Sequence, residues 1–286
     1  MLLVIDVGNT NIKMGVYNGG KLVQSWRMSV KVERTSDEFG AVMSSLFAGK
    51  NITFADIDGV IMSSVCPSVN YTIEHACEYY IGIRPISVGM GIKTGLDVKY
   101  TNPQEVGADR IVNSVAAYKL YGGPCIVVDF GTATTFNLIS ERGEFLGGCI
   151  APGIKSAMES LVNNTARLTN VELTRPETIV GRTTESNLQA GIIYGFTGLV
   201  KYIIEKFRGE SGLANAKVVA TGGLSQLVQT GGEKILDIVD RSLTLKGLKI
   251  LYDVNAGTAG NKKRYGAENR HGHEKTDADK HADAMK

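Results

Sequence analysis

Residues 2–13 of the chain read LLVIDVGNTNIK, and residues 125–135 read CIVVDFGTATT. Each stretch is an apolar, mostly aliphatic run that ends in an Asp, one more apolar residue, a Gly and several polar residues. A second apolar segment and a glycine turn follow in both places, at residues 14–20 and 136–143. Apolar runs of this length, separated by polar and glycine residues, predict β-hairpins. The chain therefore encodes one hairpin twice, with an acid and a glycine at each tip.

The composition is that of an ordinary globular protein, with 43% hydrophobic and 21% charged residues. A length of 286 residues predicts one large domain or two medium ones. The 31 basic and 29 acidic residues give a net charge of +2, and the tail at 261–286 holds seven of the basic and five of the acidic residues. The rest of the chain is neutral, so we expect neither nucleic acid nor a membrane as a partner.

Cysteine usage and the N-terminus predict a cytoplasmic protein. The four cysteines have no Cys-x-x-Cys spacing and are too few for a disulfide framework, so we expect reduced thiols. The chain begins directly with a predicted strand and shows no signal peptide. No apolar run approaches the roughly 20 residues that span a bilayer.

After each hairpin, helices and strands alternate in a similar order, which predicts two similar α/β lobes. We place these lobes at residues 1–121 and 122–260. The expected helices lie at 36–47, 71–80, 102–120, 154–161 and 189–208, and the further strands at 21–28, 59–65, 84–88, 217–220 and 248–252. Ser36 is the expected N-cap of the first helix.

The last segment, residues 261–286, is polar and has no apolar periodicity, which predicts a disordered tail. It contains His271, His273 and His281. These side chains could bind a metal, but solvated histidines of a tail are the simpler interpretation.

The first hairpin tip has the donors that phosphate groups need. Gly8 allows a tight turn whose N–H groups approach an anion, and residues 9–11 add neutral donors. Lys13 supplies a positive charge that can reach a terminal phosphate. Asp6 suits hydrated Mg²⁺, which prefers one or two carboxylates together with phosphate oxygens. The alternative is an ordinary turn in which Asp and Asn bond their own backbone, and the duplication argues against it.

The second tip differs because it has no lysine. Asp129 and the hydroxyls after it suit a cation, and Thr132 can contact phosphate oxygens. The alternative is a threonine-rich turn that caps a strand pair. A third element at residues 220–225 follows a strand with Gly-Gly and opens a helix, where negative charge is favoured. Alone it defines no site, because glycine turns after strands are common.

These motifs resemble those of a known family. Paired Asp-x-Gly hairpins followed by Gly-Gly are similar to the actin-like fold of sugar kinases and Hsp70 ATPases. Together with Gly107-Ala108-Asp109-Arg110 and Gly147-Gly148-x-x-x-Pro152-Gly153, they resemble type III pantothenate kinase over about residues 1–256. The resemblance implies an α/β fold of two actin-like, ribonuclease-H-like lobes, each a mixed sheet with helices, and an ATP cleft between them. It also implies a homodimer that phosphorylates pantothenate to 4'-phosphopantothenate with ATP, the first step of coenzyme A biosynthesis.

Asp109 and Arg110 also suit this chemistry by themselves. A carboxylate can accept the proton of an attacking hydroxyl, and a guanidinium can bind a substrate carboxylate bidentately. Without the resemblance, a charged pair on a solvated helix face is the simpler interpretation. Tyr100 alone suits packing, and Thr184 alone suits a helix N-cap.

The resemblance assigns each group of residues a role. The implied ATP contacts are Asp6, Val7, Gly8, Asn9, Thr10, Asn11, Ile12, Lys13 and Thr132. The implied substrate contacts are Tyr100, Gly107, Ala108, Asp109, Arg110 and Thr184, with Asp109 as the catalytic base. The implied cation sites are Asp129 for K⁺ or NH₄⁺, and Asp6 for Mg²⁺ through water.

Two other functions stay open. One is a nucleotide-binding regulator without turnover, because the family resemblance includes accessory factors of transcriptional control. The other is a kinase of a different small hydroxylated molecule, such as a sugar. The presence of Asp6, Lys13, Asp109 and Asp129 together favours an active kinase.

Overall fold

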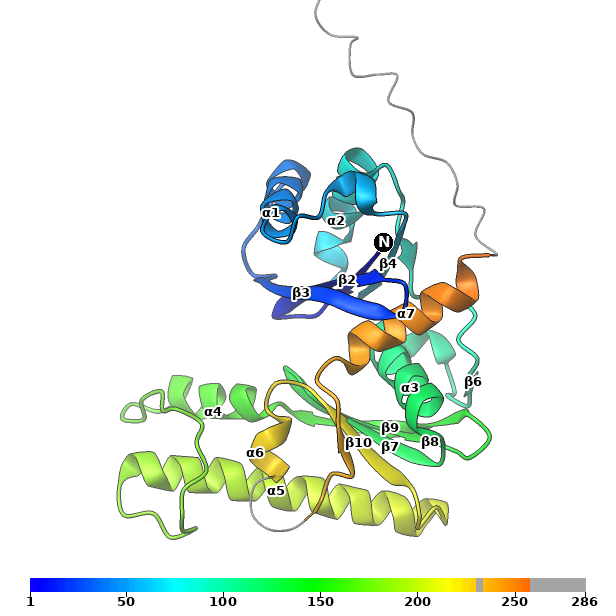
Figure 1. Cartoon of the computed structure of the whole chain (residues 1–286). Coiled ribbons are helices and arrows are strands. Elements are labelled where there is room, and N and C mark those ends of the chain that lie inside the picture. Colours follow the sequence, from blue (N-terminus) through cyan, green and yellow to red (C-terminus); the bar gives the residue numbers. More distant parts are fainter. Residues whose placement is uncertain (230–233, 258–286) are drawn as a thin grey trace, which may run out of the picture.

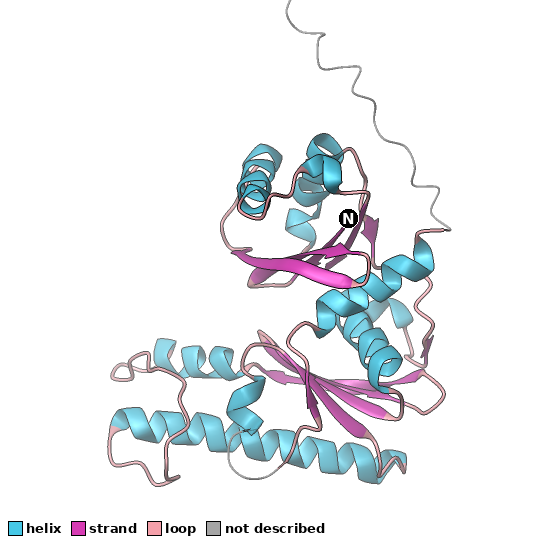
Figure 2. Ribbon diagram, in the orientation of Figure 1, coloured by secondary structure: helices cyan, strands magenta, loops and turns pink. Residues whose placement is uncertain are grey.

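The computed structural model describes residues 1–229 and 234–257, so the expected tail and its three histidines lie outside the described residues. It contains two mixed β-sheets, each with helices on both faces (Figures 1 and 2). The α/β fold with two mixed sheets is therefore confirmed. None of the described helices is both long and apolar enough to cross a membrane. All four cysteines are free thiols.

The two sheets repeat one strand order. The first sheet has the order β3-β2-β1-β4-β5, and the second contains the equivalent order β9-β8-β7-β10-β11. In both, the hairpin strands are antiparallel and the next two strands run parallel to the first. The strands of the first sheet are β1 (Leu2–Val7), β2 (Asn11–Asn18), β3 (Lys21–Ser29), β4 (Gly59–Ser64) and β5 (Ile86–Ser87). Those of the second are β7 (Cys125–Phe130), β8 (Ala133–Ile139), β9 (Glu144–Pro152), β10 (Lys217–Thr221) and β11 (Ile238–Val239).

The helices divide the molecule into layers (Figure 1). α1 (Ser36–Ala48) and α2 (Asn70–Ala76) cover the outer face of the first sheet, and a π turn at Cys77–Ile81 follows α2. α4 (Ile154–Asn163) and α5 (Thr184–Ser211) cover the outer face of the second sheet, and the short α6 (Ser225–Gln229) follows β10. α3 (Ala108–Tyr121) and α7 (Leu243–Asn255) lie between the two sheets.

Two segments, β6 (Asp97–Val98) and α7, pack on the lobe opposite the one to which their position in the sequence assigns them. β6 pairs with β9 and extends the second sheet. α7, at the end of the described chain, packs on α3 and on the first sheet. The boundary that we expect between residues 121 and 122 stays a prediction, and both segments cross it.

Three local predictions are wrong. Residues 248–252 form part of helix α7 and not a strand, because Leu245, Leu248 and Leu251 are buried at helical spacing. The helix expected from residue 102 is only a short 3₁₀ turn at Pro103–Glu105, and α3 begins separately at Ala108. Thr35, not Ser36, caps α1.

Candidate active site

Strand alternation points both hairpin acids towards the layer between the sheets. In β1, the outer core takes Leu3, Ile5 and Val7, so Asp6 faces inwards with Leu2 and Val4. In β7, the outer core likewise takes residues 126, 128 and 130, so Asp129 faces inwards. The duplication therefore sets the two acids symmetrically about the inner helices.

The two hairpin tips face each other. The Thr10 and Thr132 hydroxyl oxygens lie 2.8 Å apart and share a hydrogen bond, although 122 positions separate them in the chain. The tips also have similar turns: the Gly8 N–H donates to the Asn11 carbonyl at 3.0 Å, and the Gly131 N–H to the Ala133 carbonyl at 3.1 Å. Two segments far apart in sequence thus present polar groups to one region.

The second tip is fixed from behind by the start of α4. The Gly153 N–H and the Ser156 hydroxyl both donate to the Thr132 carbonyl, at 3.1 and 2.7 Å. A Cβ on Gly153 would lie 2.3 Å from that carbonyl oxygen, so only glycine permits this approach. The Pro152-Gly153 part of the motif therefore holds Thr132 in place.

Asp6 is buried beside one lysine. It is only 7% exposed, accepts a hydrogen bond from the Ser63 hydroxyl at 2.9 Å, and lies 3.7 Å from the Lys13 ammonium. Lys13 stands directly opposite Asp6 in the β1–β2 register. Burial raises the Asp6 pKa above its ordinary value, whereas Lys13 and Ser63 lower it and the negative charge of Asp109 raises it further.

Asp129 shares this environment. Burial, followed by the nearby charges of Asp109 and Asp6, raises its pKa to about 6, whereas Lys13 and an amide hydrogen bond oppose the rise. The amide belongs to Asn113 of α3, whose Nδ2 donates to the Asp129 carboxylate at 3.0 Å. Three mutually repelling carboxylates and one lysine therefore leave an excess of negative charge, which favours bound cations.

Asp109 stands in the first turn of α3. Its carboxylate accepts the Arg110 backbone N–H at 2.7 Å, and Gly107 is the N-cap residue. Burial raises the Asp109 pKa, whereas that N–H and the Arg110 charge lower it. A carboxylate with a raised pKa, at a helix start that favours its ionised form, suits proton abstraction near neutral pH.

Arg110 and Tyr100 meet on one aromatic ring. The Arg110 guanidinium carbon lies 5.7 Å from the Phe145 ring centre, and the Tyr100 ring centre lies 6.3 Å from it. Arg110 is only 6% exposed, and its Nε donates to the side-chain amide oxygen Oδ1 of Asn137 at 2.7 Å. A solvated charged pair on a helix face is therefore excluded for Asp109 and Arg110.

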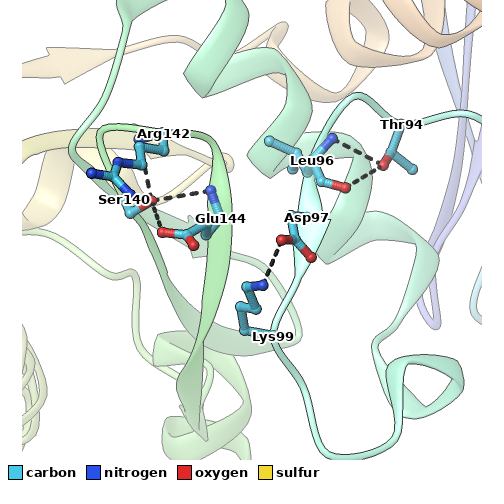
Figure 3. Close-up of polar contacts among 7 residues, drawn as sticks. All are labelled: Thr94, Leu96, Asp97, Lys99, Ser140, Arg142 and Glu144. Carbon is cyan, nitrogen blue, oxygen red and sulfur yellow. Dashed lines mark hydrogen bonds and ion pairs between the residues drawn. The ribbon is translucent and has the colours of Figure 1, made fainter.

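A short strap at residues 97–99 runs beside β9 (Figure 3), and Tyr100 follows it directly in the chain. Asp97 pairs with Glu144 in the parallel register of β6 and β9, and the Lys99 N–H donates to the Phe145 carbonyl at 2.9 Å. The Lys99 ammonium contacts the Asp97 carboxylate at 2.6 Å, as Figure 3 shows. Sequence reasoning misses this strap, because a two-residue strand has no detectable periodicity.

Thr184 is not brought to these residues within one chain. It is the first residue of α5, and α5 begins at the left end of the second lobe in Figure 1, away from α3. The N-cap predicted at Thr184 is wrong, because the Thr183 hydroxyl accepts the Ser186 N–H at 3.1 Å and caps the helix.

The oxygen atoms of these side chains suit cations that also retain water or phosphate oxygens as ligands. Among the described residues, no group of three or more His, Cys, Asp or Glu side chains could hold a metal ion alone. Mg²⁺ needs no such cage when phosphate oxygens and water complete its shell. Beside Asp129, the Asn113 amide oxygen is buried without a hydrogen-bond partner, and an oxygen of this kind suits a monovalent cation. Sequence reasoning finds neither Asn113 nor Asn137, because a buried amide within a helix or strand has no motif.

Comparisons with known proteins identify the family of this chain. The model of the family described as type III pantothenate kinase matches residues 2–206. A type III pantothenate kinase of Bacillus cytotoxicus is 48% identical over 256 residues, which are 90% of this chain and 97% of the relative.

Two solved structures share the fold at low identity. A "conserved putative Baf family transcriptional activator" from Campylobacter jejuni has a TM-score of 0.55 and 21% identity, over 89% of this chain and 99% of its own. A "putative 2-dehydro-3-deoxygalactonokinase protein" from Sinorhizobium meliloti has a TM-score of 0.54 and 11% identity, over 93% of this chain and 100% of its own. At these identities the likeness concerns the fold alone.

Proposed function

The chain belongs to the type III pantothenate kinase family, and from this premise we propose that it transfers the γ-phosphoryl group of ATP to the primary hydroxyl of pantothenate. The products are 4'-phosphopantothenate and ADP, and the reaction opens coenzyme A biosynthesis. The observation that supports this most is the convergence of Asp6, Lys13, Asp109 and Asp129, which come from four separate elements, β1, β2, α3 and β7.

ATP lies with its phosphates between the two hairpin tips. Backbone N–H groups and the neutral side chains of residues 8–11, with Thr132, bind phosphate oxygens. Lys13 neutralises the negative charge that develops during transfer. Asp6 would hold Mg²⁺ bound with ATP, and the ion would neutralise further phosphate charge.

Asp109 and Arg110 act on the acceptor. Asp109 takes the proton of the primary hydroxyl while the hydroxyl oxygen attacks the γ-phosphorus and ADP leaves. Arg110 binds the pantothenate carboxylate, and Tyr100 with residues 107–108 shapes the rest of that site. Burial raises the pKa of this base above its ordinary value, whereas the charges of Arg110 and Lys13 oppose the rise.

Asp129 binds K⁺ or NH₄⁺ beside the phosphates. Its raised pKa of about 6 reflects an unfavourable buried charge, and a bound cation would relieve that cost. Replacement of potassium by sodium should depress turnover, and equal rates in the two salts would argue against this role.

We place the enzyme in the cytoplasm as a homodimer. Exposed large apolar side chains of the second lobe support an interface there: Leu146, Ile150, Leu161, Ile179, Val180 and Tyr202. A dimer also offers a role for Thr184, because α5 of one chain begins away from its own Asp109 and can approach only the substrate of the second copy.

A coupled ADP-release assay with and without pantothenate tests the kinase function. We expect ADP release that depends on pantothenate and exceeds release with a panel of polyols and sugars. A nucleotide-binding regulator would show no pantothenate-dependent release, and a sugar kinase would respond to a member of the panel instead.

A further inference from the structure

Arg110 is a buried cation that makes no side-chain ion pair within the described residues, although its charge acts on the neighbouring Asp109. It is 6% exposed, and none of the ion pairs within residues 1–229 and 234–257 includes it. Its Nη2 atom is buried without a hydrogen-bond partner. Burial of an unpaired guanidinium costs free energy unless an anion binds it. The surroundings of Arg110 therefore suit an incoming anion.

Asn137 fixes the orientation of this guanidinium. Its amide oxygen accepts the Arg110 Nε–H at 2.7 Å, and both residues are buried. Asn137 lies in the middle of β8 and is 1% exposed, although Asn is depleted in strand interiors. On the neighbouring strand, a Cβ at Gly148 would lie 2.9 Å from Arg110 Nη2 and 1.9 Å from the Phe136 carbonyl, so glycine there leaves the space that Arg110 occupies.

We propose that Asn137 is a positioning residue that fixes Arg110 to bind the substrate carboxylate, an inference that rests on the proposed function. With Nε already engaged, a carboxylate can bind Arg110 bidentately only through the Nη1–Nη2 edge. The Asn137 Nδ2 is a second buried donor without a partner. Two buried donor atoms of this pair, Arg110 Nη2 and Asn137 Nδ2, thus lack partners, and its one buried acceptor is already used, a pattern that selects an anion.

The neutral amide matters as much as the hydrogen bond. An amide oxygen orients the guanidinium and leaves its positive charge free for the substrate. A carboxylate at the same position would keep the hydrogen bond but pair with Arg110, and so compete with the substrate carboxylate. The two properties can therefore be separated by substitution.

The test compares pantothenate with its alcohol analogue, in which –CH₂OH replaces the carboxylate, in wild type, Asn137→Leu and Asn137→Asp. The wild type should prefer pantothenate. Asn137→Leu should raise the KM for pantothenate about 10- to 100-fold, as expected for a lost hydrogen bond to a charged group, with kcat nearly unchanged. Asn137→Asp should raise it at least as much. Neither variant should change kcat/KM for the alcohol by more than about 2-fold, because that substrate makes no ion pair with Arg110.

Asn255→Ala is the matched control. Asn255 is also a buried amide, bonded to the Lys93 backbone, but it lies at the end of α7. Removal of the Asn255 amide should lower Tm and change kcat/KM for both substrates by the same factor. Asn137→Asp keeps an oxygen that accepts the Arg110 Nε–H, so the comparison can be made with this variant alone if Asn137→Leu does not fold.

Equal losses on both substrates in the Asn137 variants would overturn the inference, and so would an unchanged KM for pantothenate. A wild type that phosphorylates both substrates without preference would refute the carboxylate anchor, and the inference with it, but not the kinase. A wild type that phosphorylates neither would refute the proposed function itself.

Discussion

At the scale of single residues, the site depends on carboxylates that are costly to ionise. Asp6, Asp109 and Asp129 all have raised pKa values, first because of burial. Lys13 is the cation that lowers the pKa of all three. Such a set is unfavourable in the free protein and becomes favourable when cations and substrates bind.

Asp109→Asn tests the base. The amide keeps an acceptor for the Arg110 N–H but cannot take a proton, so kcat should fall by about two orders of magnitude or more, with KM values nearly unchanged. Because the pKa of Asp109 is raised, wild-type kcat/KM should fall on acidification as this carboxylate becomes protonated. Steady-state kinetics in a series of buffers from neutral to acidic pH measure both effects. A kcat close to that of the wild type would refute the assignment.

Asp129→Asn should stabilise the free protein. The folded-state pKa of about 6 exceeds the ordinary value of 3.8, so this group's contribution to stability is present below about pH 4 and is lost as the pH rises through about 6. Above that pH the variant, which carries no such charge, should melt a few degrees higher than the wild type, and the gap should close on acidification. KCl should raise the wild-type Tm more than that of the variant.

Thermal melts across this pH range, with Asp253→Asn at an exposed site as control, give the comparison. An Asp129→Asn variant that is less stable than wild type at pH 8, or that responds equally to KCl, would contradict the cation role.

At the scale of elements, α3 carries residues that we propose for the acceptor site. Asp109 and Arg110 in its first turn, and Asn113 one turn later, contact substrate groups or Asp129 in our account. α7 packs against α3 so closely that a Cβ on Gly247 would lie 2.4 Å from the Val112 carbonyl oxygen. The position of the first turn therefore depends on this helix crossing.

Gly247→Ala should lower stability by about 1–3 kcal/mol, because the added methyl pushes α7 from α3. Gly209→Ala is the control: it lies exposed near the end of α5 with open space around its Cβ, and should gain up to about 1 kcal/mol. Urea denaturation of both variants measures these changes in stability. Equal midpoints for the two would mean that α7 does not pack closely against α3.

Sequence predicts helices and strands well where a pattern repeats. It predicts them poorly where an element is short or where its type depends on what it packs against. Both hairpins and the Asp-x-Gly tips follow from periodicity and glycine placement. The apolar run at residues 248–252 fits a strand or a helix equally, and only its packing on α3 and the first sheet decides for α7. The amides of Asn113 and Asn137 become informative only when the fold shows that both are buried without full hydrogen bonding.

At the scale of the whole molecule, β6 joins the second sheet and α7 packs on the first. The chain therefore connects the two lobes more than once. The resemblance assigns Thr184 to the substrate, yet the start of α5 lies away from α3. Sequence cannot settle this, because it does not say which copy of the chain supplies a residue.

A mixed dimer tests that arrangement. One chain carries Asp109→Asn and the other Thr184→Ala, and two different affinity tags select the heterodimer. If each site combines both chains, one of its two sites is intact and activity should reach about half that of the wild type. Both parent homodimers should be nearly inactive, and heterodimer activity equal to their low mean would place Thr184 and Asp109 in the same chain. A Thr184→Ala homodimer with wild-type activity would remove Thr184 from the site.

The proposed mechanism requires both hairpin tips to bind one triphosphate beside Asp109. A crystal structure with pantothenate and a non-hydrolysable ATP analogue tests it directly. We predict the γ-phosphate between residues 8–11 and Thr132, with the primary hydroxyl of pantothenate within hydrogen-bond distance of the Asp109 carboxylate. A nucleotide bound by one tip alone, or a hydroxyl that faces away from Asp109, would contradict the account.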